Sequence, residues 1–181
     1  MRNTTKISIL NGLILLGLTL SEFFGLIKFD LLLPYHWHKI LHIIGVVLFM
    51  GNMIVGPIWF MYAYFSKDKT LLKFAGKLLE LTDIYLTVPG IALTVLNGLY
   101  LASVYGGTKH QPWLFYSIIL LFVMWALSIP LIYLQEKMYQ ALDKGFDLKI
   151  IDNLLIRWGV LGTIVMIPPS VMFYLMIVKT I

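Results

Sequence analysis

The chain has 181 residues, of which 60% are hydrophobic and 13% are charged, and its formal net charge is +5. Soluble domains average about 45–50% apolar and about 25% charged residues, so this chain carries more apolar surface than a water-soluble core buries. It contains no cysteine, which excludes disulfides, thiolate metal sites, iron–sulfur clusters and covalent haem attachment. Its basic residues flank apolar runs, a distribution typical of membrane orientation signals and not of nucleic-acid binding.

Five apolar segments are long enough to cross a bilayer, which needs about 20 mostly apolar residues per helix. In chain order they cover residues 7–27, 37–65, 84–105, 114–134 and 160–178. The sequence therefore predicts an all-α fold, a polytopic membrane bundle of five transmembrane helices that forms a single domain over residues 1–181. Arg2 and Lys6 before the first segment also suit a signal peptide, but no small-x-small cleavage site follows, so we expect a retained helix.

Two polar segments next to these spans also have helical patterns. Leucines and Phe74 alternate with Lys73, Lys77 and Glu80 at near-helical spacing, which predicts an amphipathic extension of the third helix. Residues 135–142 predict a similar extension of the fourth helix, with Gly145 as its stop signal.

The basic residues predict the orientation of the bundle. The side that holds the N-terminus and the second and fourth loops carries Arg2, Lys6, Lys67, Lys69, Lys73, Lys77, Lys137, Lys144, Lys149 and Arg157. The other side carries only Lys28, Lys39, Lys109 and Lys179. Because basic loops stay in the cytoplasm, we expect the N-terminus inside and the C-terminus outside, in the cytoplasmic membrane of a bacterium.

The histidines are the clearest candidates for chemistry, and all of them fall on the predicted outer side. His36, His38 and His42 lie at the start of the second helix, and His110 lies in the loop after the third. His38 and His42 are four residues apart and share a helix face. Imidazole is a good ligand for haem iron, zinc and copper. Histidines at the headgroup level are also ordinary interfacial residues, an interpretation that suits His36 and His110 better than the deeper His42.

The start of the second helix resembles that of small bacterial haem-associated membrane proteins. Residues 35–45 read YHWHKILHIIG and resemble the HemJ-type protoporphyrinogen oxidases and a neighbouring family of predicted integral membrane proteins of unknown function. Pro89, the run Leu96-Asn97-Gly98, Trp113, residues 131–145 and Arg157 extend the resemblance, which covers residues 35–178. It implies that His42 is an axial ligand of a b-type haem, with His38, His110, Asn97 and Trp113 as further candidates for the cofactor site.

The chain departs from the HemJ pattern at positions that matter for activity. Ser117 stands where that pattern has a lysine, and Ile58 stands where an arginine follows the proline of the first family helix. Gly159-Val160 replaces an Asn-Glu pair. The lysine would be a second ligand or a base, and the arginine would pair with a haem propionate. The sequence therefore argues against protoporphyrinogen oxidation and matches the family of unknown function more closely.

Three functions remain open at this point. The first is a haem b protein with His42 as ligand, for redox chemistry or haem handling, with a membrane electron donor or acceptor as partner. Its second ligand would be His110, Met172 or a group from a second subunit of a homodimer, or the position stays open. The second is a zinc or copper site built from His38, His42 and Glu22, with His110 as a further ligand. The third is a non-catalytic assembly protein that contacts the bilayer and other membrane proteins. If the protein is an enzyme, the resemblance implies an oxidoreductase.

Overall fold

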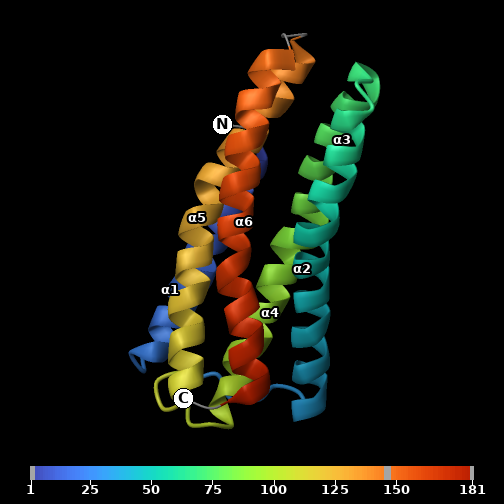
Figure 1. Ribbon diagram of the computed structural model, residues 1–181. Coiled ribbons are helices and arrows are strands. Elements are labelled where there is room, and N and C mark those ends of the chain that lie inside the picture. Colours follow the sequence, from blue (N-terminus) through green and yellow to red (C-terminus); the bar gives the residue numbers. More distant parts are fainter. Residues whose placement is uncertain (1–2, 145–147, 180–181) are drawn as a thin grey trace.

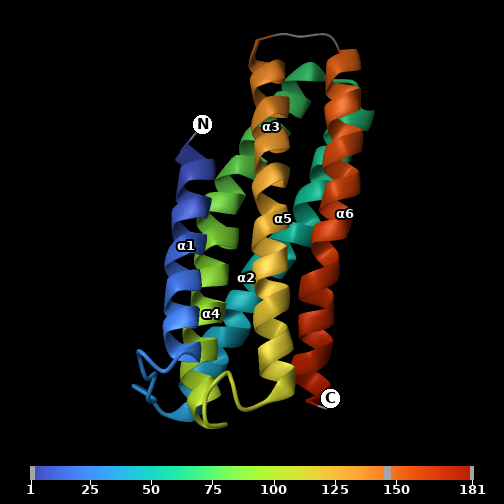
Figure 2. The same ribbon diagram turned by 90° about the vertical axis from the view of Figure 1, so that its left-hand side faces the viewer.

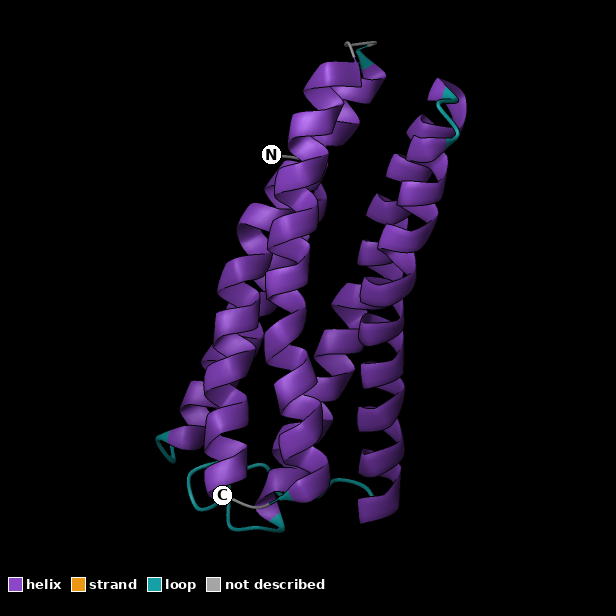
Figure 3. Cartoon of the chain, viewed as in Figure 1, coloured by secondary structure: helices purple, strands orange, loops and turns teal. Residues whose placement is uncertain are grey.

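The computed structural model describes residues 3–144 and 148–179 (Figure 1). Within these ranges the regular structure is entirely helical, with loops and turns gathered at the two ends of the bundle (Figure 3). Five helices are long and apolar enough to cross a membrane, which confirms the predicted all-α, five-span fold. The helical elements are α1 (Asn3–Phe23), α2 (Tyr35–Phe65), α3 (Lys69–Thr82), the π-helical η1 (Asp83–Thr87), α4 (Val88–Ser103), α5 (Pro112–Asp143) and α6 (Leu148–Val178).

The helices pack as two long pairs with α1 alongside. The chain α3–η1–α4 is continuous and makes one span of 35 residues, so the predicted amphipathic extension of the third helix is confirmed. α2 packs along α4, α5 packs along α6, and α1 lies against α4 and α5 (Figure 2). α3 and the far ends of α2, α5 and α6 project from the same end of the bundle (Figure 1).

The first span ends earlier than the sequence suggested. We expected helix to residue 27, but α1 ends at Phe23. Gly25 has a φ of +73°, and the N–H of Leu26 donates to the carbonyl of Ser21 while that of Gly25 donates to Glu22. This pair of bonds is a Schellman motif, in which a left-handed glycine stops the helix although the apolar run continues.

The last span begins well before residue 160, the predicted start. Ile151, Leu155 and Trp158 are buried, and their spacing of four and three residues gives α6 an apolar face where we had expected a loop. They join Phe60, Leu72, Ala75, Leu79, Met138 and Ala141 in one hydrophobic cluster at the projecting end. The polar residues of this segment fall on the other faces, and Asp152 accepts a hydrogen bond from Tyr64 at 2.6 Å. α5 reaches Asp143, as predicted for residues 135–142, while Gly145 lies outside the described residues.

The closest approach in the bundle is between α2 and α4. A Cβ on Gly45 would lie 2.6 Å from the carbonyl oxygen of Gly90 and 2.5 Å from Thr94 Oγ1. A Cβ on Gly90 would lie 2.8 Å from the backbone nitrogen of Phe49. The two backbones therefore touch at a point where no side chain fits, as small residues allow in membrane bundles.

Gly45→Ala should destabilise the protein, because the added methyl must displace backbone atoms of α4. Overpacking of this kind costs about 1–3 kcal/mol, which should lower the midpoint of thermal unfolding in detergent. Gly51→Ala in the same helix is the matched control, since a Cβ there meets no atom within 4 Å. Equal melting temperatures for the two variants would contradict the close α2–α4 packing.

The orientation can be tested directly because the native chain has no cysteine. Lys109→Cys in the α4–α5 loop should react with a membrane-impermeant maleimide in intact cells, since that loop is predicted to be outside. Lys69→Cys at the start of α3 should react only after permeabilisation. The reverse pattern of labelling would overturn the predicted orientation.

Candidate functional site

His38 is a structural residue at the end of the bundle where α2 begins. Its side chain is 3% exposed, and its ring stacks on Tyr100 with centroids 4.6 Å apart. The backbone N–H of Leu33 donates to Nε2 at 3.1 Å, so Nε2 is the unprotonated nitrogen. Nδ1 then carries the proton and donates to Asn97 Oδ1 at 2.9 Å. Because both ring nitrogens are engaged, His38 has no lone pair free for a metal.

His42 lies one turn deeper in α2 and has a different arrangement. Its Nδ1 lies 2.7 Å from the carbonyl oxygen of Thr94, so Nδ1 is the donor and Nε2 keeps its lone pair. Among the described residues no group hydrogen-bonds to that Nε2. The ring is held against α4, where a Cβ on Gly98 would lie 3.3 Å from His42 Cε1 and Nδ1. His42 is therefore a half-buried imidazole with a fixed tautomer and one unused ligand position.

The other predicted ligands do not join His42. Glu22, at the end of α1, accepts hydrogen bonds from the backbone N–H of Thr108, at 3.1 Å, and from its hydroxyl. This carboxylate ties α1 to the α4–α5 loop. His36 and His110 are exposed to solvent. In the described part of the chain, no three His, Asp or Glu residues are grouped to hold a metal ion.

Trp113 and Asn97 have packing and hydrogen-bonding roles. Trp113, at the start of α5, is 6% exposed and meets Tyr105 edge to face at 5.4 Å. The ammonium of Lys179 lies over both rings and donates to the Tyr105 hydroxyl at 2.8 Å. That hydrogen bond lowers the pKa of Tyr105. Asn97 accepts from His38 and donates to the carbonyl of Leu93 at 2.9 Å.

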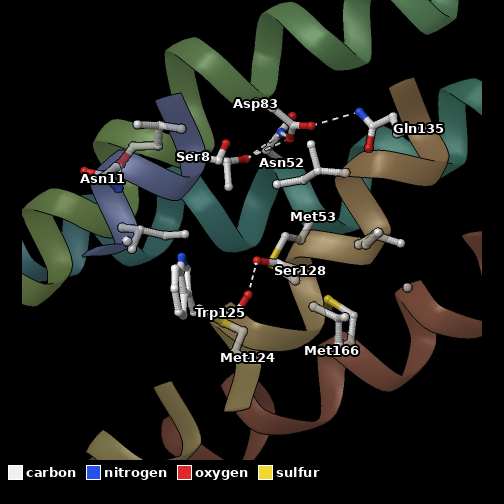
Figure 4. A pocket seen from close by; sticks show the side chains of 18 of the residues that line it. Ser8, Asn11, Asn52, Met53, Asp83, Met124, Trp125, Ser128, Gln135 and Met166 are labelled. Carbon is white, nitrogen blue, oxygen red and sulfur yellow. Dashed lines mark hydrogen bonds between the residues drawn. The ribbon is translucent and has the colours of Figure 1, made fainter. Parts of the chain in front are cut away.

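A second site, which the sequence analysis missed, lies deeper in the bundle. A cavity of about 510 Å³ is lined by residues from all five spans. Asn52, Asp83, Gln135 and Ser8 lie on one side of it (Figure 4). The methionines Met53, Met124 and Met166 and the indole of Trp125 line other parts (Figure 4). The cavity has the size and the mainly apolar wall of a small-molecule pocket.

Asp83 organises the polar side of the cavity. Asn52 Nδ2 donates to Asp83 Oδ1 at 3.0 Å, and the Thr87 hydroxyl donates to the same oxygen at 3.2 Å. Gln135 Nε2 donates to Asp83 Oδ2 at 2.8 Å. The carboxylate thus joins η1 to α2 and α5. Ionisable groups inside a membrane bundle are costly, which makes each one a candidate functional residue.

The sequence held a signal for Asp83, although the predicted span began just after it, at residue 84. The amphipathic segment before it and the apolar segment after it are both helical, so Asp83 falls inside one continuous helix. Pro89 lacks the N–H that would bond to the carbonyl of residue 85. The π-helical turn over Asp83–Thr87 precedes this proline, and such turns often mark functional positions.

Comparison with known proteins gives the family but no activity. Residues 37–180 match the family model described as a predicted integral membrane protein, DUF2269. No curated protein and no solved structure matches the chain. The matched region includes α2 after its first two residues, the α3–α4 span, α5 and α6. The chain therefore belongs to the DUF2269 family of multi-pass integral membrane proteins.

Proposed function

We propose that this protein binds a b-type haem in a bacterial cytoplasmic membrane, with His42 as an axial ligand, and serves redox chemistry or haem handling. The observation that carries the proposal is the state of the His42 ring. Its Nδ1 is 2.7 Å from a backbone carbonyl oxygen, and its Nε2 has no hydrogen-bond partner among the described residues. Haem- and metal-ligating histidines have this arrangement, because the carbonyl fixes the tautomer and raises the basicity of the free nitrogen.

The other histidines narrow the choice of a second ligand. His38 is fully engaged, and His110 is exposed in a loop. Met172 is partly buried beside the cluster formed by Phe49, Met124 and Val165, between the α2–α4 and α5–α6 pairs, so it is the candidate within this chain. A group from a second subunit of a homodimer, or an open position, are the alternatives. When bound, haem would supply one-electron chemistry, and an open position would favour ligand binding over simple electron transfer.

The positions that differ from the HemJ pattern support a different activity from protoporphyrinogen oxidation. Ser117 is 4% exposed and its hydroxyl donates to the carbonyl of Trp113 at 2.7 Å, so it replaces a lysine without offering a ligand or a base. Ile58 is 62% exposed on the outer surface of α2, where an arginine side chain would not point into the bundle. We therefore infer a haem site that does not oxidise protoporphyrinogen.

A zinc or copper site is a weaker alternative on this geometry. It needs three or four ligands within about 2.0–2.3 Å of one ion, and no three His, Asp or Glu residues are grouped in that way in the described part of the chain. The role of assembly partner remains compatible with the fold, and it predicts that His42 can be replaced without effect.

His42→Ala should remove the cofactor because no other described histidine holds a free, buried nitrogen. Protein expressed with added haem precursor and purified in detergent should show a Soret band that shifts on reduction with dithionite, and His42→Ala should lose at least about nine-tenths of it, as expected when a sole strong ligand is removed.

His36→Ala is the matched control, since His36 lies in the same helix but is exposed, and it should keep the spectrum. His42→Gln tests for misfolding, because its amide can keep the hydrogen bond to Thr94 while lacking the imidazole. A colourless wild-type protein, or a spectrum unchanged in both His42 variants, would refute the proposal.

A further inference from the structure

We propose that the intramembrane cavity is a binding site for an amphiphile that has a compact apolar body and a protonated amine as its head. This inference goes beyond haem binding and does not depend on it. No histidine occurs among the described residues that line the cavity. Asp83, the polar anchor of the cavity, is separated from His42 along the α2–α4 pair by the Gly45–Gly90 contact.

The apolar wall defines the body of the ligand. Side chains of all five spans surround the space, and most are Leu, Ile, Val, Met or aromatic residues. A cavity of about 510 Å³ lies within the range of sites for small organic molecules, about 300–1,000 Å³. The charged group of the lining, Asp83, lies on one side, whereas most of the remaining wall is apolar.

The polar side defines the head. Asp83 is the one carboxylate, and no Lys, Arg, His or Glu occurs among the described residues that line the cavity. Its donors are neutral amides and a hydroxyl, so its negative charge has no cationic partner in the described part of the chain. A carboxylate that is removed from water is costly unless a positive charge pairs with it, and a cation in the cavity would supply that charge.

Asn52 provides a second and independent indication. Its side chain is 6% exposed, and its Nδ2 bonds to Asp83 and to the Thr87 hydroxyl. Its Oδ1 is buried without any hydrogen-bond partner. A buried acceptor without a partner costs about 1–3 kcal/mol. An ammonium head has three donors, enough to serve both Asp83 and this oxygen after a small side-chain rotation.

The depth of the site suits a molecule that partitions from the bilayer. Asp83 lies 20 residues before Ser103, the last residue of α4, or about 30 Å along the helix at 1.5 Å per residue. This equals the thickness of the hydrocarbon layer, about 30 Å. The polar side of the cavity is thus near one membrane interface, at the end with the basic residues. An amphiphile in that leaflet would have its head level with Asp83 and its body toward the bilayer centre.

The experiment compares three probes with the same cage and different heads: 1-adamantanamine, 1-adamantanol and 1-adamantanecarboxylate. Binding to the protein in phosphatidylcholine nanodiscs is measured by saturation-transfer NMR, with empty nanodiscs to subtract partitioning. We expect the amine to bind at least about tenfold more tightly than the alcohol, as a charge-assisted hydrogen bond allows, and the carboxylate not to bind. The indole N–H of Trp158 is also buried without a partner, and it could donate to the hydroxyl of the alcohol. The alcohol is therefore the probe against which the preference for the amine is tested most strictly.

Two pairs of variants separate the head from the body of the site. Asp83→Asn should abolish the preference for the amine, while Asp30→Asn, an exposed acid in the α1–α2 loop, should keep it. Gly162→Leu places a side chain in the cavity, where a Cβ meets only Leu131 at 3.8 Å, and should weaken binding of the amine. Gly17→Leu, where a Cβ meets no atom within 4 Å, is its control on an exposed face of α1.

His42→Ala should leave amine binding unchanged, which separates this site from the proposed haem site. Equal binding of amine and alcohol by the wild-type protein, or the same amine preference in Asp83→Asn, would overturn the assignment of the head. Unchanged amine binding in Gly162→Leu would overturn the assignment of the cavity. If Asp83→Asn does not fold, the ranking of the probes on the wild-type protein still decides the proposal.

Discussion

The contact between α2 and the α3–α4 span is the constraint on which both candidate sites depend. At the glycine crossing the helix backbones are so close that the side chains above and below it must fit one another. On α2 the contacting residues are separated by alternating steps of four and three, which is the period of a coiled-coil seam. On this seam His38 pairs with Asn97, His42 with Thr94, Gly45 and Phe49 with Gly90, and Asn52 with Thr87 and Asp83. One antiparallel seam therefore positions the free imidazole at one end and the buried carboxylate at the other.

The polar pairs along this seam explain why it has a single register. In a bilayer, apolar contacts between helices are exchanged for equally apolar contacts with lipid, so they discriminate poorly between alternative packings. A shift of one turn would separate His38 from Asn97 and Asn52 from Asp83 and leave several buried polar groups unpaired. Each such group costs about 1–3 kcal/mol. His42 belongs to the same seam, but only its Nδ1 is engaged there, by the carbonyl oxygen of Thr94.

The spans and the amphipathic extensions could be predicted because each depends on a local pattern of apolar residues. Glu22 and His38 show the limit of such patterns. Both were plausible metal ligands by residue type and depth, but one caps the N–H of Thr108 and the other joins the α1–α2 loop to Asn97. These are partnerships with distant backbone and side-chain groups that no spacing along the sequence encodes. Asp83 was missed for a related reason, since a charged residue beside an apolar run is usually the end of a span. Only its hydrogen bonds to α2 and α5 show that its side chain is enclosed by the bundle.

The cavity follows from the irregularities of the same helices. Pro57 lines it from α2, and the π-turn before Pro89 widens the facing span at the level of Asp83 and Thr87. A proline and a π-turn each interrupt the regular hydrogen-bond ladder and bend a helix, so both spans are irregular where they line the cavity, although Asn52 still bonds to Thr87 and Asp83 across them. At the projecting end α2, α3, α5 and α6 pack together through the hydrophobic cluster that includes Phe60. Water outside the membrane drives these apolar faces together. A ligand in this cavity would make dispersion contacts with the apolar lining on every side. The same ligand would also pair with Asp83 if its head were a cation, so two separate interactions would stabilise it in the site.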